Sequence, residues 1–517
     1  MLGRRQKAIR AAVLAVAVAF PSLASSRPVS GQEIDRIAAT AIKAYDIPGI
    51  SIAVVQPGQP VHAKGYGVID DPASPAVDAR TLFGIGSISK AFTTTLLAML
   101  VEEGKLHWDD PVIKYIPEFR MSDPWVTRQF TVRDLLTHRS GLAPYAGDLV
   151  MLIEDKANRP HVYRALANLP AATSFRSQFA YDNLLYIVAG DLIERVSGQS
   201  WQDFVTARIL TPLGMTGCVA DQTRIPASAS RAAAHDFDNG KLTRVDFPLP
   251  AVTVPAGGIF CNAEGMAHWL AFNLDQDDRV KLAKAEKDEL FTPVTPIPAA
   301  KLGGGSFASY GLGWLLRDRY GQMQARHGGG LPGMVSFITV FPRDGVGIMV
   351  MTNRTSGAAE VIANQIADRI FTESTDDKVT SAGRAELAAI AGAQAAAKKD
   401  TGAGVDAALA RRPALPLERY AGRYSDQWFG DATVVVEGNA LRIDLGGKAF
   451  SAKLRHLGGD TFVAEWSDRS LNADAYVSFV TDAAGRVTRI AMTPVSKRTD
   501  PSYGFASLNL VKIAAAD

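Results

Sequence analysis

The stretch that decides the fold reads Phe83-Gly84-Ile85-Gly86-Ser87-Ile88-Ser89-Lys90. Apolar residues recur at helical spacing from residue 91 to residue 103, and Gly104 stops the pattern, so a helix is predicted directly after the stretch. Ser87 then lies in the first turn, with Lys90 one turn later on the same face. Unpaired N–H groups at a helix start favour a serine alkoxide, and a partly neutral lysine can take the serine's proton. The spacing predicts a nucleophile and its base; a capping serine with a surface lysine is the alternative.

Composition narrows the class of protein. The chain has 517 residues, 47% of them hydrophobic, which allows two or three domains with large cores. A net charge of +2 gives no reason to expect nucleic acid or acidic lipid as a partner. Because no His/Cys/carboxylate cluster has zinc-ligand spacing and His-Glu-x-x-His is absent, we expect no metal and no cofactor.

Residues 1–24 are predicted to be a signal peptide. Basic residues precede an apolar run from Ala11 to Phe20, which is too short to span a bilayer, and Ser22-Leu23-Ala24 is a small-x-small cleavage site. We therefore expect a periplasmic or secreted protein, cleaved near Ala24. No cysteine lies at the cleavage site and no later run reaches membrane-spanning length, so no stable membrane anchor is expected.

The two cysteines, Cys218 and Cys261, leave two alternatives. In an exported protein they can pair. Two buried free thiols fit equally well, because a chain with this apolar content needs no covalent staple.

A second chemical pattern is Tyr181-Asp182-Asn183, just before a helix predicted from Leu184 to Val196. A tyrosine there can supply a phenolate-like oxygen if a cation lowers its pKa, and Lys90 is the candidate cation. Asn183 can offer both a donor and an acceptor to a substrate amide. The alternative is an asparagine helix cap beside a packed tyrosine.

A third pattern, His327-Gly328-Gly329-Gly330, begins a run of three predicted antiparallel strands that ends at Thr352. Backbone N–H groups of a glycine-rich edge strand can face a reacting carbonyl without obstruction, and His327 can hydrogen-bond into the site. The alternative is a glycine-rich turn with a surface histidine. The pattern alone is weak, because His456-Leu457-Gly458 also matches it.

The remaining N-terminal pattern predicts a sheet flanked by helices. An amphipathic helix from Ile34 to Tyr45 is followed by strands over Gly49–Gln56 and Val61–Val68. Further on, Thr131 and Asp134 form a capping box for a short helix. His138 comes near the end of this helix, where we expect it to bind a C-terminal carbonyl rather than to act in catalysis.

The three patterns occur in the order Ser-x-x-Lys, Tyr-x-Asn, His-x-Gly, and together the sequence resembles the class C β-lactamase and penicillin-binding-protein-like serine hydrolases. The resemblance covers roughly residues 34–371. Framing segments also match: Leu135-Leu136-Thr137-His138-Arg139-Ser140-Gly141-Leu142, Pro212-Leu213-Gly214-Met215 and Pro255-Ala256-Gly257-Gly258. The resemblance implies an α+β fold, in which helices cover an antiparallel sheet on one side and a helical subdomain lies opposite.

The resemblance also implies roles. Ser87 would be the acylated nucleophile, Lys90 and Tyr181 the proton-transfer pair, and the N–H groups of Ser87 and Gly330 the oxyanion hole. Substrate-binding residues implied in the same way are Asn183, His327, Gly329 and Gly330.

One departure matters for the substrate. Where β-lactamases usually carry lysine in the third motif, this chain has His327. Lysine is a fixed cation that can hold a substrate carboxylate, whereas histidine near neutral pH is mostly uncharged. The chain is therefore more similar to the peptidases, D-residue aminopeptidases and esterases of the family. Gly-x-Ser-x-Gly is absent, so an α/β-hydrolase elbow is excluded.

The C-terminal part differs in pattern. Residues 374–416 read as an Ala-rich linker with a helix from Ala385 to Lys399. From residue 417 to residue 517 the apolar period becomes two, with seven or eight short strands and a Gly438-Asn439 hairpin turn, which predicts a small closed barrel. It resembles the lipocalin-like C-terminal domains of some of these hydrolases. We expect it to pack over the active-site mouth or to mediate oligomer contacts.

The predicted function is that of an exported serine hydrolase, with its catalytic domain over residues 30–373. An acyl-enzyme would cleave amide bonds of short or linear peptides, including peptides with D- or unusual residues. A carboxylesterase and a β-lactamase are the enzyme alternatives. A penicillin-binding or peptidoglycan-sensing module with little turnover is the alternative of another class. The expected partner is a small peptide or ester substrate, and a homo-oligomer is left open.

Overall fold

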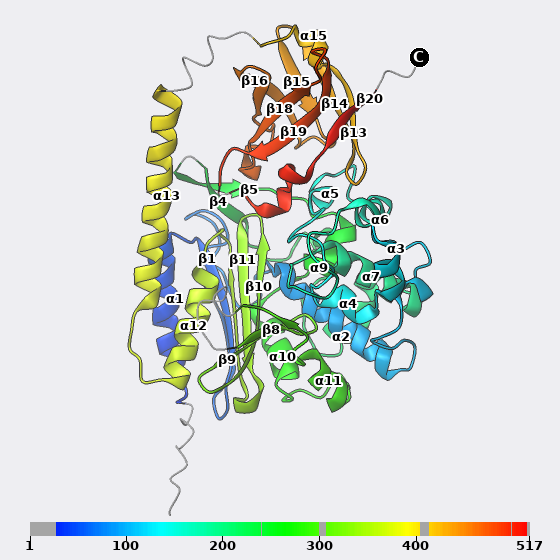
Figure 1. Cartoon of the computed structure of the whole chain (residues 1–517). Helices are drawn as coiled ribbons and strands as arrows, with labels where there is room; N and C mark the ends of the chain where they lie inside the picture. Colours follow the sequence, from blue (N-terminus) through cyan, green and yellow to red (C-terminus); the bar gives the residue numbers. More distant parts are fainter. Residues whose placement is uncertain (1–26, 239, 299–306, 404–412, 498, 514–517) are drawn as a thin grey trace, which may run out of the picture.

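The computed structural model describes residues 27–238, 240–298, 307–403, 413–497 and 499–513 (Figure 1). The expected signal peptide lies outside the described residues. A large α+β domain carries a small β-barrel at one end, and a long helix, α13 (Lys378–Ala403), runs along the domain toward the barrel (Figure 1). The α+β class and the C-terminal barrel are therefore confirmed.

An antiparallel sheet of eight strands, in the order β2-β1-β12-β11-β10-β9-β8-β7, forms the centre of the large domain. Because β1 pairs with β12 from Ile50 opposite Thr352, the first and last parts of the domain meet as the second and third strands of the sheet. The strands are β1 (Gly49–Val55), β2 (His62–Gly67), β7 (Thr295–Pro296), β8 (Ala308–Tyr310), β9 (Leu315–Arg319), β10 (Gln322–Leu331), β11 (Met334–Phe341) and β12 (Val346–Thr352).

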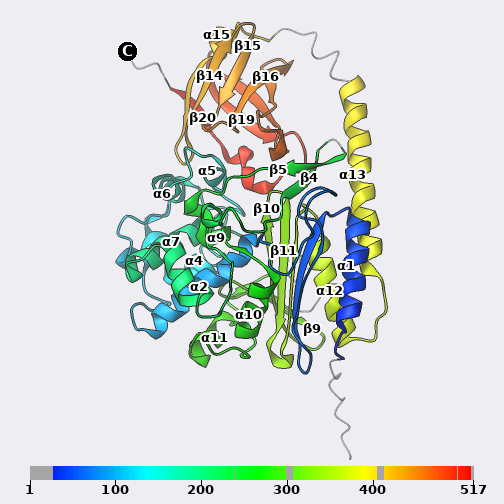
Figure 2. The ribbon, with the colours of Figure 1, turned by 180° about the vertical axis from the view of Figure 1, so that it is seen from behind.

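Helices cover both faces of this sheet. Along β1, Ile50, Ile52 and Val54 face one apolar cluster, while Ala53 and Val55 face the other, as expected for side chains that alternate along a strand. Figure 2 shows α1 (Gly31–Tyr45), α12 (Ala358–Phe371) and α13 on one side, with α2 (Ser89–Glu102) and α10 (Ala263–Asn273) on the other.

The helical subdomain surrounds α2, which is buried from Ser89 to Leu100. Phe92 of α2 stacks on Trp269 of α10, with ring centroids 3.8 Å apart. The other helices on this side are α3 (Pro124–Gln129), α4 (Val132–Leu136), α5 (Leu149–Leu152), α6 (Arg159–Asn168), α7 (Leu184–Ser197), α8 (Trp201–Val205), α9 (Val254–Gly257) and α11 (Lys284–Leu290). The predicted capping box of Thr131 and Asp134 is present at α4.

Helix α13 occupies most of the segment expected to be a linker. Gly383 packs against the backbone of α1, where a Cβ would lie 2.6 Å from the Ala44 carbonyl oxygen. The buried Arg354 guanidinium pairs with Glu386 of α13 and donates to the Tyr45 carbonyl at the end of α1. The helix is thus fixed to the large domain by backbone packing and by an ion pair with a buried arginine.

The C-terminal barrel closes through the pairing of its first strand with its last, Tyr424 opposite Lys512. Apolar side chains alternate into its interior along each strand, which is why the period-two pattern was readable. The last strand begins at Leu510, after Phe505–Ser507 has formed a 3-10 turn. The strands are β13 (Gly422–Asp426), β14 (Gly430–Glu437), β15 (Ala440–Asp444), β16 (Ser451–Gly458), β17 (Thr461–Ala464), β18 (Ala475–Thr481), β19 (Val487–Pro494) and β20 (Leu510–Ile513).

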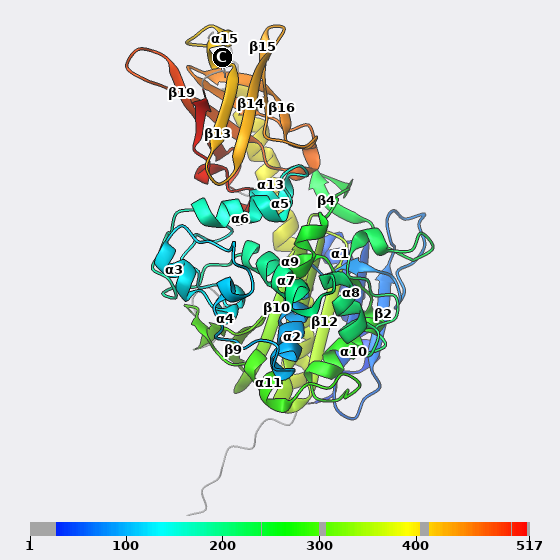
Figure 3. The same cartoon turned by 90° about the vertical axis from the view of Figure 1, so that its right-hand side faces the viewer.

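The barrel sits above α5 and α6 of the large domain (Figure 3). Its apolar core is continuous with the core around α2. Among the described residues, the structure contains no helix whose length and apolar character would let it cross a bilayer.

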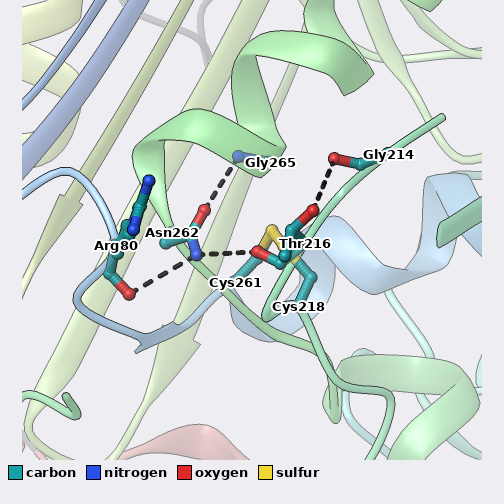
Figure 4. The surroundings of a disulfide bond; sticks show 7 residues. All are labelled: Arg80, Gly214, Thr216, Cys218, Cys261, Asn262 and Gly265. Atoms are coloured by element: carbon teal, nitrogen blue, oxygen red, sulfur yellow. Dashed lines mark hydrogen bonds between the residues drawn. A yellow bond between two sulfur atoms is a disulfide. The ribbon is translucent and has the colours of Figure 1, made fainter. Parts of the chain in front are cut away.

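Cys218 and Cys261 form a disulfide, with a sulfur–sulfur distance of 1.92 Å, which decides between the two alternatives left by the sequence. Cys261 lies in β6 (Phe260–Cys261) and pairs with Phe83 of β3 (Phe83–Gly84), the strand that leads to Ser87. Gly265 of α10 faces both sulfurs, and a Cβ there would lie 2.3 Å from the Cys218 sulfur (Figure 4). The helix can approach the disulfide this closely because residue 265 has no side chain.

Removal of the disulfide by the paired substitutions Cys218→Ser and Cys261→Ser is expected to lower the free energy of unfolding. The bond joins residues 43 positions apart. Closing a loop of this length stabilises the fold by about 4 kcal/mol in the chain-entropy model. Thermal melting of both proteins, with and without reductant, measures the effect. Equal melting temperatures for the oxidised and reduced wild-type protein would contradict the assignment.

Candidate active site

Ser87 lies in a 3-10 turn (Gly86–Ile88) between β3 and α2, two residues before the helix that the sequence placed it in. Gly86 has a left-handed φ of 52°, and a Cβ on it would lie 2.7 Å from the Gly330 amide nitrogen of β10. Any side chain at this position would push the turn away from the strand. Glycine at residue 86 therefore brings Ser87 beside the backbone of β10.

The third motif supplies the facing backbone. A Cβ on Gly329 would lie 1.9 Å from the Ile85 carbonyl oxygen and 2.4 Å from the Ser336 hydroxyl, which itself donates to that oxygen at 2.7 Å. Gly328 and Gly330, by contrast, have open space where a Cβ would stand. Because Gly329 has no side chain, β10 can contact the turn that carries Ser87. Gly328 and Gly330 add no side chains that would cover the strand.

The exposed side of β10 is an edge over the same residues. Strand β9 pairs with β10 only as far as Arg326, opposite Leu315. From His327 to Leu331, β10 is paired with β11 alone among the described strands. β10 is thus an inner strand of the sheet and not an edge strand as predicted, but its glycine-rich end forms a local edge beside the serine.

Lys90 is fully buried, and its amine meets three oxygens: Ser87 Oγ at 3.1 Å, Asn183 Oδ1 at 2.7 Å and the Ala256 carbonyl at 2.8 Å. Burial lowers the pKa of Lys90 to about 7, although Asp148 and Asp182 act in the opposite direction. A neutral amine needs only two N–H groups for Asn183 and Ala256. Its lone pair is then free to face the Ser87 hydroxyl and accept its proton.

Asn183 and two buried acids surround this amine. Asn183 Nδ2 donates to Asp148 Oδ2 at 2.7 Å, so both ends of the amide are engaged within the protein. Asp182 accepts from the Leu185 amide at the start of α7. Burial raises the pKa of Asp182 to about 7 and that of Asp148 well above its usual range. The asparagine therefore holds the lysine, and its direct contact with substrate stays a prediction.

Tyr181 lies over the lysine, with Lys90 Nζ 4.9 Å from the centre of its ring. Its hydroxyl is buried and has no hydrogen-bond partner among the described residues. The expectation that a cation lowers its pKa is wrong: burial, followed by Tyr310, raises the pKa of Tyr181 well above 10, and Ser87 opposes this only in part. Tyr181 is thus a neutral phenol that can donate or relay a proton.

His327 is a neutral, fully engaged side chain. Its Nδ1 donates to the Gly328 carbonyl at 2.6 Å, so Nε2 is left to accept from the Tyr310 hydroxyl at 2.9 Å. Burial and then Lys90 lower the pKa of His327 to about 3. The His327 side chain therefore carries no positive charge above that pH, as the presence of histidine in place of lysine in the third motif predicted.

His138 has a structural role that differs from the one expected. It has a left-handed φ of 53° and is buried against the rings of Tyr181 and Tyr310, 4.2 and 4.5 Å away. Its Nδ1 accepts from the Asp182 amide at 3.1 Å and binds no helix carbonyl. Burial lowers the pKa of His138 well below 6.5, so a neutral ring supports the tyrosine from behind.

Three residues of the site were not assigned roles from the sequence. Asp182 lies inside the second motif, between Tyr181 and Asn183, and this position was the signal that could have identified it. Tyr310 and Asp148 carry no local signal, because they reach the site only through the fold. Within the described part of the chain, no group of His, Cys, Asp or Glu side chains could hold a metal ion.

Comparisons with known proteins show the family and the fold of the chain. A family model described as beta-lactamase matches residues 34–373, more than half of the chain. A second model, described as a domain of unknown function (DUF3471), matches residues 407–512. A curated relative from Aspergillus violaceofuscus, named unguisins hydrolase, is 29% identical over 355 residues, which are 64% of this chain and 62% of the relative. The chain thus spans about three fifths of the length of that curated relative (62%).

Solved structures show the same fold. An octameric penicillin-binding protein homologue from Pyrococcus abyssi aligns with a TM-score of 0.57 at 22% identity, over 94% of this chain and 100% of the other. A class C beta-lactamase mutant aligns with a TM-score of 0.55 at 20% identity, over 65% of this chain and 96% of the other.

The substitution Gly329→Ala is expected to lower both stability and activity, because its Cβ would overlap the Ile85 carbonyl. Overpacking of this kind costs about 1–3 kcal/mol. The matched control is Gly328→Ala, where a Cβ meets open space, and we expect its melting temperature to stay close to that of the wild type. Thermal melting and ester hydrolysis compare the two variants, and equal stability would refute the packing explanation.

The activity is expected to rise with pH through about 7, because Lys90 must be neutral to accept the Ser87 proton. Below that pH, kcat/KM should fall about tenfold per pH unit. No descending limb is expected below pH 10, because the pKa of Tyr181 is raised. In Asp182→Asn, a carboxylate that favours the ammonium form is lost, so the rising limb should move to lower pH. Rates of nitrophenyl ester hydrolysis from pH 5 to 10 measure both profiles, and a limb that moves upward would contradict this role.

Proposed function

The chain belongs to the beta-lactamase family of serine hydrolases, and we propose that it is an exported enzyme that cleaves amide bonds of short or linear peptides. The reaction passes through an acyl-enzyme on Ser87. The observation that carries the choice of substrate is the uncovered, glycine-lined edge of β10 beside the serine.

An extended peptide can add to such an edge as a further strand. Main-chain hydrogen bonds then hold the peptide, and the absence of side chains on Gly328 and Gly330 leaves room for it. A scissile carbonyl bound in this way lies next to the turn that carries Ser87. The open edge of β10 therefore favours a linear, extended peptide as the substrate rather than a compact bicyclic molecule.

In the proposed reaction, neutral Lys90 takes the Ser87 proton while Ser87 Oγ attacks the carbonyl carbon. The N–H groups of Ser87 and Gly330 stabilise the oxyanion. Tyr181, as a neutral phenol beside Lys90, relays the proton to the departing amine. Water then attacks the acyl-enzyme, with the same groups moving the protons in the reverse direction.

The state of His327 argues against the β-lactamase alternative. A fixed cation at this position would hold a substrate carboxylate, but the imidazole is buried, neutral and bonded on both nitrogens. The carboxylesterase alternative uses the same nucleophile and differs only in the bond that is cleaved. A penicillin-binding or sensing module would show a long-lived acyl-enzyme in place of turnover.

Two further observations bear on where and how the protein acts. The Cys218–Cys261 disulfide supports an oxidising compartment, as does the basic and apolar leader, so we propose a periplasmic or secreted location. Hydrolysis is the activity in the name of the Aspergillus violaceofuscus relative. A homo-oligomer stays a proposal, prompted by the word octameric in the description of the Pyrococcus abyssi structure.

Serine-dependent cleavage of peptides is the expected result when the protein and its Ser87→Ala variant are incubated with a diverse pool of linear peptides, including D-residue and blocked-end members. Loss of the nucleophile should lower the rate by at least about 10³-fold, since only binding and oxyanion effects remain. Mass spectrometry identifies the bonds cleaved. Cleavage retained in the variant would refute the assignment, and ester hydrolysis without peptide cleavage would favour the esterase.

A further inference from the structure

Asp148 is a buried acid that has no part in the reaction proposed above. It precedes α5, has 0% of its surface exposed, and accepts from Asn183 Nδ2 at 2.7 Å. A carboxylate oxygen facing this amide nitrogen acts as an acceptor, so the nitrogen end of the amide must face Asp148. The oxygen end is then turned toward Lys90, where it accepts from Nζ at 2.7 Å. Asp148 thus decides which end of the amide meets the lysine.

The barrel holds the segment that follows Asp148. Lys156 donates to the Asp431 carbonyl at 3.1 Å and lies 4.7 Å from the centre of the Phe429 ring. Asp155 accepts from the Gly447 amide at 2.9 Å. The first residues of β14 and the turn after β15 therefore bind the chain between α5 and α6, on which the barrel sits (Figure 3).

A third part of the barrel reaches Asp148 itself. The turn Pro501–Tyr503 contacts α5, and Ser502 favours the ionised form of Asp148, while burial raises the pKa of that acid. Asp148 Oδ1 is buried and has no hydrogen-bond partner among the described residues, and Ser502 is the polar neighbour that the barrel brings near this acid. The acid is enclosed between Asn183 on one side and the barrel on the other.

We propose that Asp148 is a positioning residue for Lys90, acting through Asn183, and that the C-terminal barrel completes the active site by holding Asp148 in place. The inference rests on the proposed function only in taking Ser87 as the nucleophile and Lys90 as its base. It makes the barrel a part of the proton-transfer apparatus of the hydrolase domain.

The test uses the full chain and a substrate-independent readout, the rate at which a fluorophosphonate probe labels Ser87 with loss of fluoride, followed by intact mass spectrometry. Asp148→Ala leaves the Asn183 amide free to turn, so labelling should slow by about 10- to 100-fold, the range known for residues that orient the ligands of a metal ion. Asp148→Asn retains an oxygen acceptor and should stay within about fivefold of the wild type.

The pH dependence of labelling separates positioning from folding. The charged and titratable groups that face Lys90 are Asp148, Asp182, Tyr181, Tyr186, His138 and His327. In Asp148→Ala the Asn183 oxygen is free to turn away from Lys90, so the ammonium form loses an acceptor and the rising limb should move to lower pH. In Asp148→Asn that acceptor is kept in place, so the limb should stay close to that of the wild type. A role confined to packing would leave the limb of Asp148→Ala where it is.

The contribution of the barrel is tested with two serines in neighbouring turns. Ser502→Ala should slow labelling by about two- to tenfold, because it removes the polar neighbour that the barrel places beside Asp148. Ser507→Ala is the matched control, because its hydroxyl donates to Gly504 within the barrel at 2.7 Å. In the Asp148→Ala background, Ser502→Ala should add nothing further, because both residues act through the same contact.

Each result decides the proposal. Wild-type labelling in Asp148→Ala, or equal loss in Asp148→Ala and Asp148→Asn, would overturn the positioning role. Equal rates for Ser502→Ala and Ser507→Ala, or additive effects of Ser502→Ala and Asp148→Ala, would overturn the role of the barrel. If Asp148→Ala does not fold, Asp148→Asn and the serine pair still test the proposal. Probe labelling without cleavage of any peptide would count against the proposed function alone.

Discussion

The structure depends on the burial of one amine. Lys90 has no exposed surface, and a charged ammonium in such a place loses the water that would stabilise it. Three oxygens replace that water, and each comes from a different part of the chain: the turn before α2, the residue before α7, and the carbonyl end of α9. The sheet and the helical subdomain must therefore be assembled around α2 before this lysine has its partners and its lowered pKa.

A second constraint, close backbone contact, follows from the same assembly. The turn that carries Ser87 touches β10 at Gly86 and Gly329, where neither residue could have a Cβ. Ser336 of β11 ties this contact to the next strand by donating to the Ile85 carbonyl. The nucleophile is thus held against a rigid sheet, while the same strand stays open at its outer edge. Fixed placement of the serine and access for an extended substrate come from one run of glycines.

Much of the fold and of the site could be predicted from local sequence patterns, and the predictions that failed have one cause. The three motifs, the glycine-rich strand and the barrel each depend on residues close together in sequence or on a short period. The pKa of Tyr181 was expected to fall because only Lys90 was visible as a neighbour, whereas enclosure by Tyr310 and other remote residues raises it. Asp148 lies 35 positions before its partner Asn183 and follows no pattern. Properties set by enclosure could not be predicted, because enclosure comes from packing between distant segments.

The contacts of the barrel also bear on what kind of influence it has. The sequence led us to expect a barrel that packs over the active-site mouth or mediates oligomer contacts, and both alternatives stay predictions. The contacts described here run to Asp148, Asp155 and Lys156, and from Asp148 through Asn183 to Lys90. Ser87 and Gly330 take their positions from the sheet and not from this chain of contacts. A change in the barrel would therefore alter proton transfer for every substrate alike, which is a different effect from selection among substrates by size.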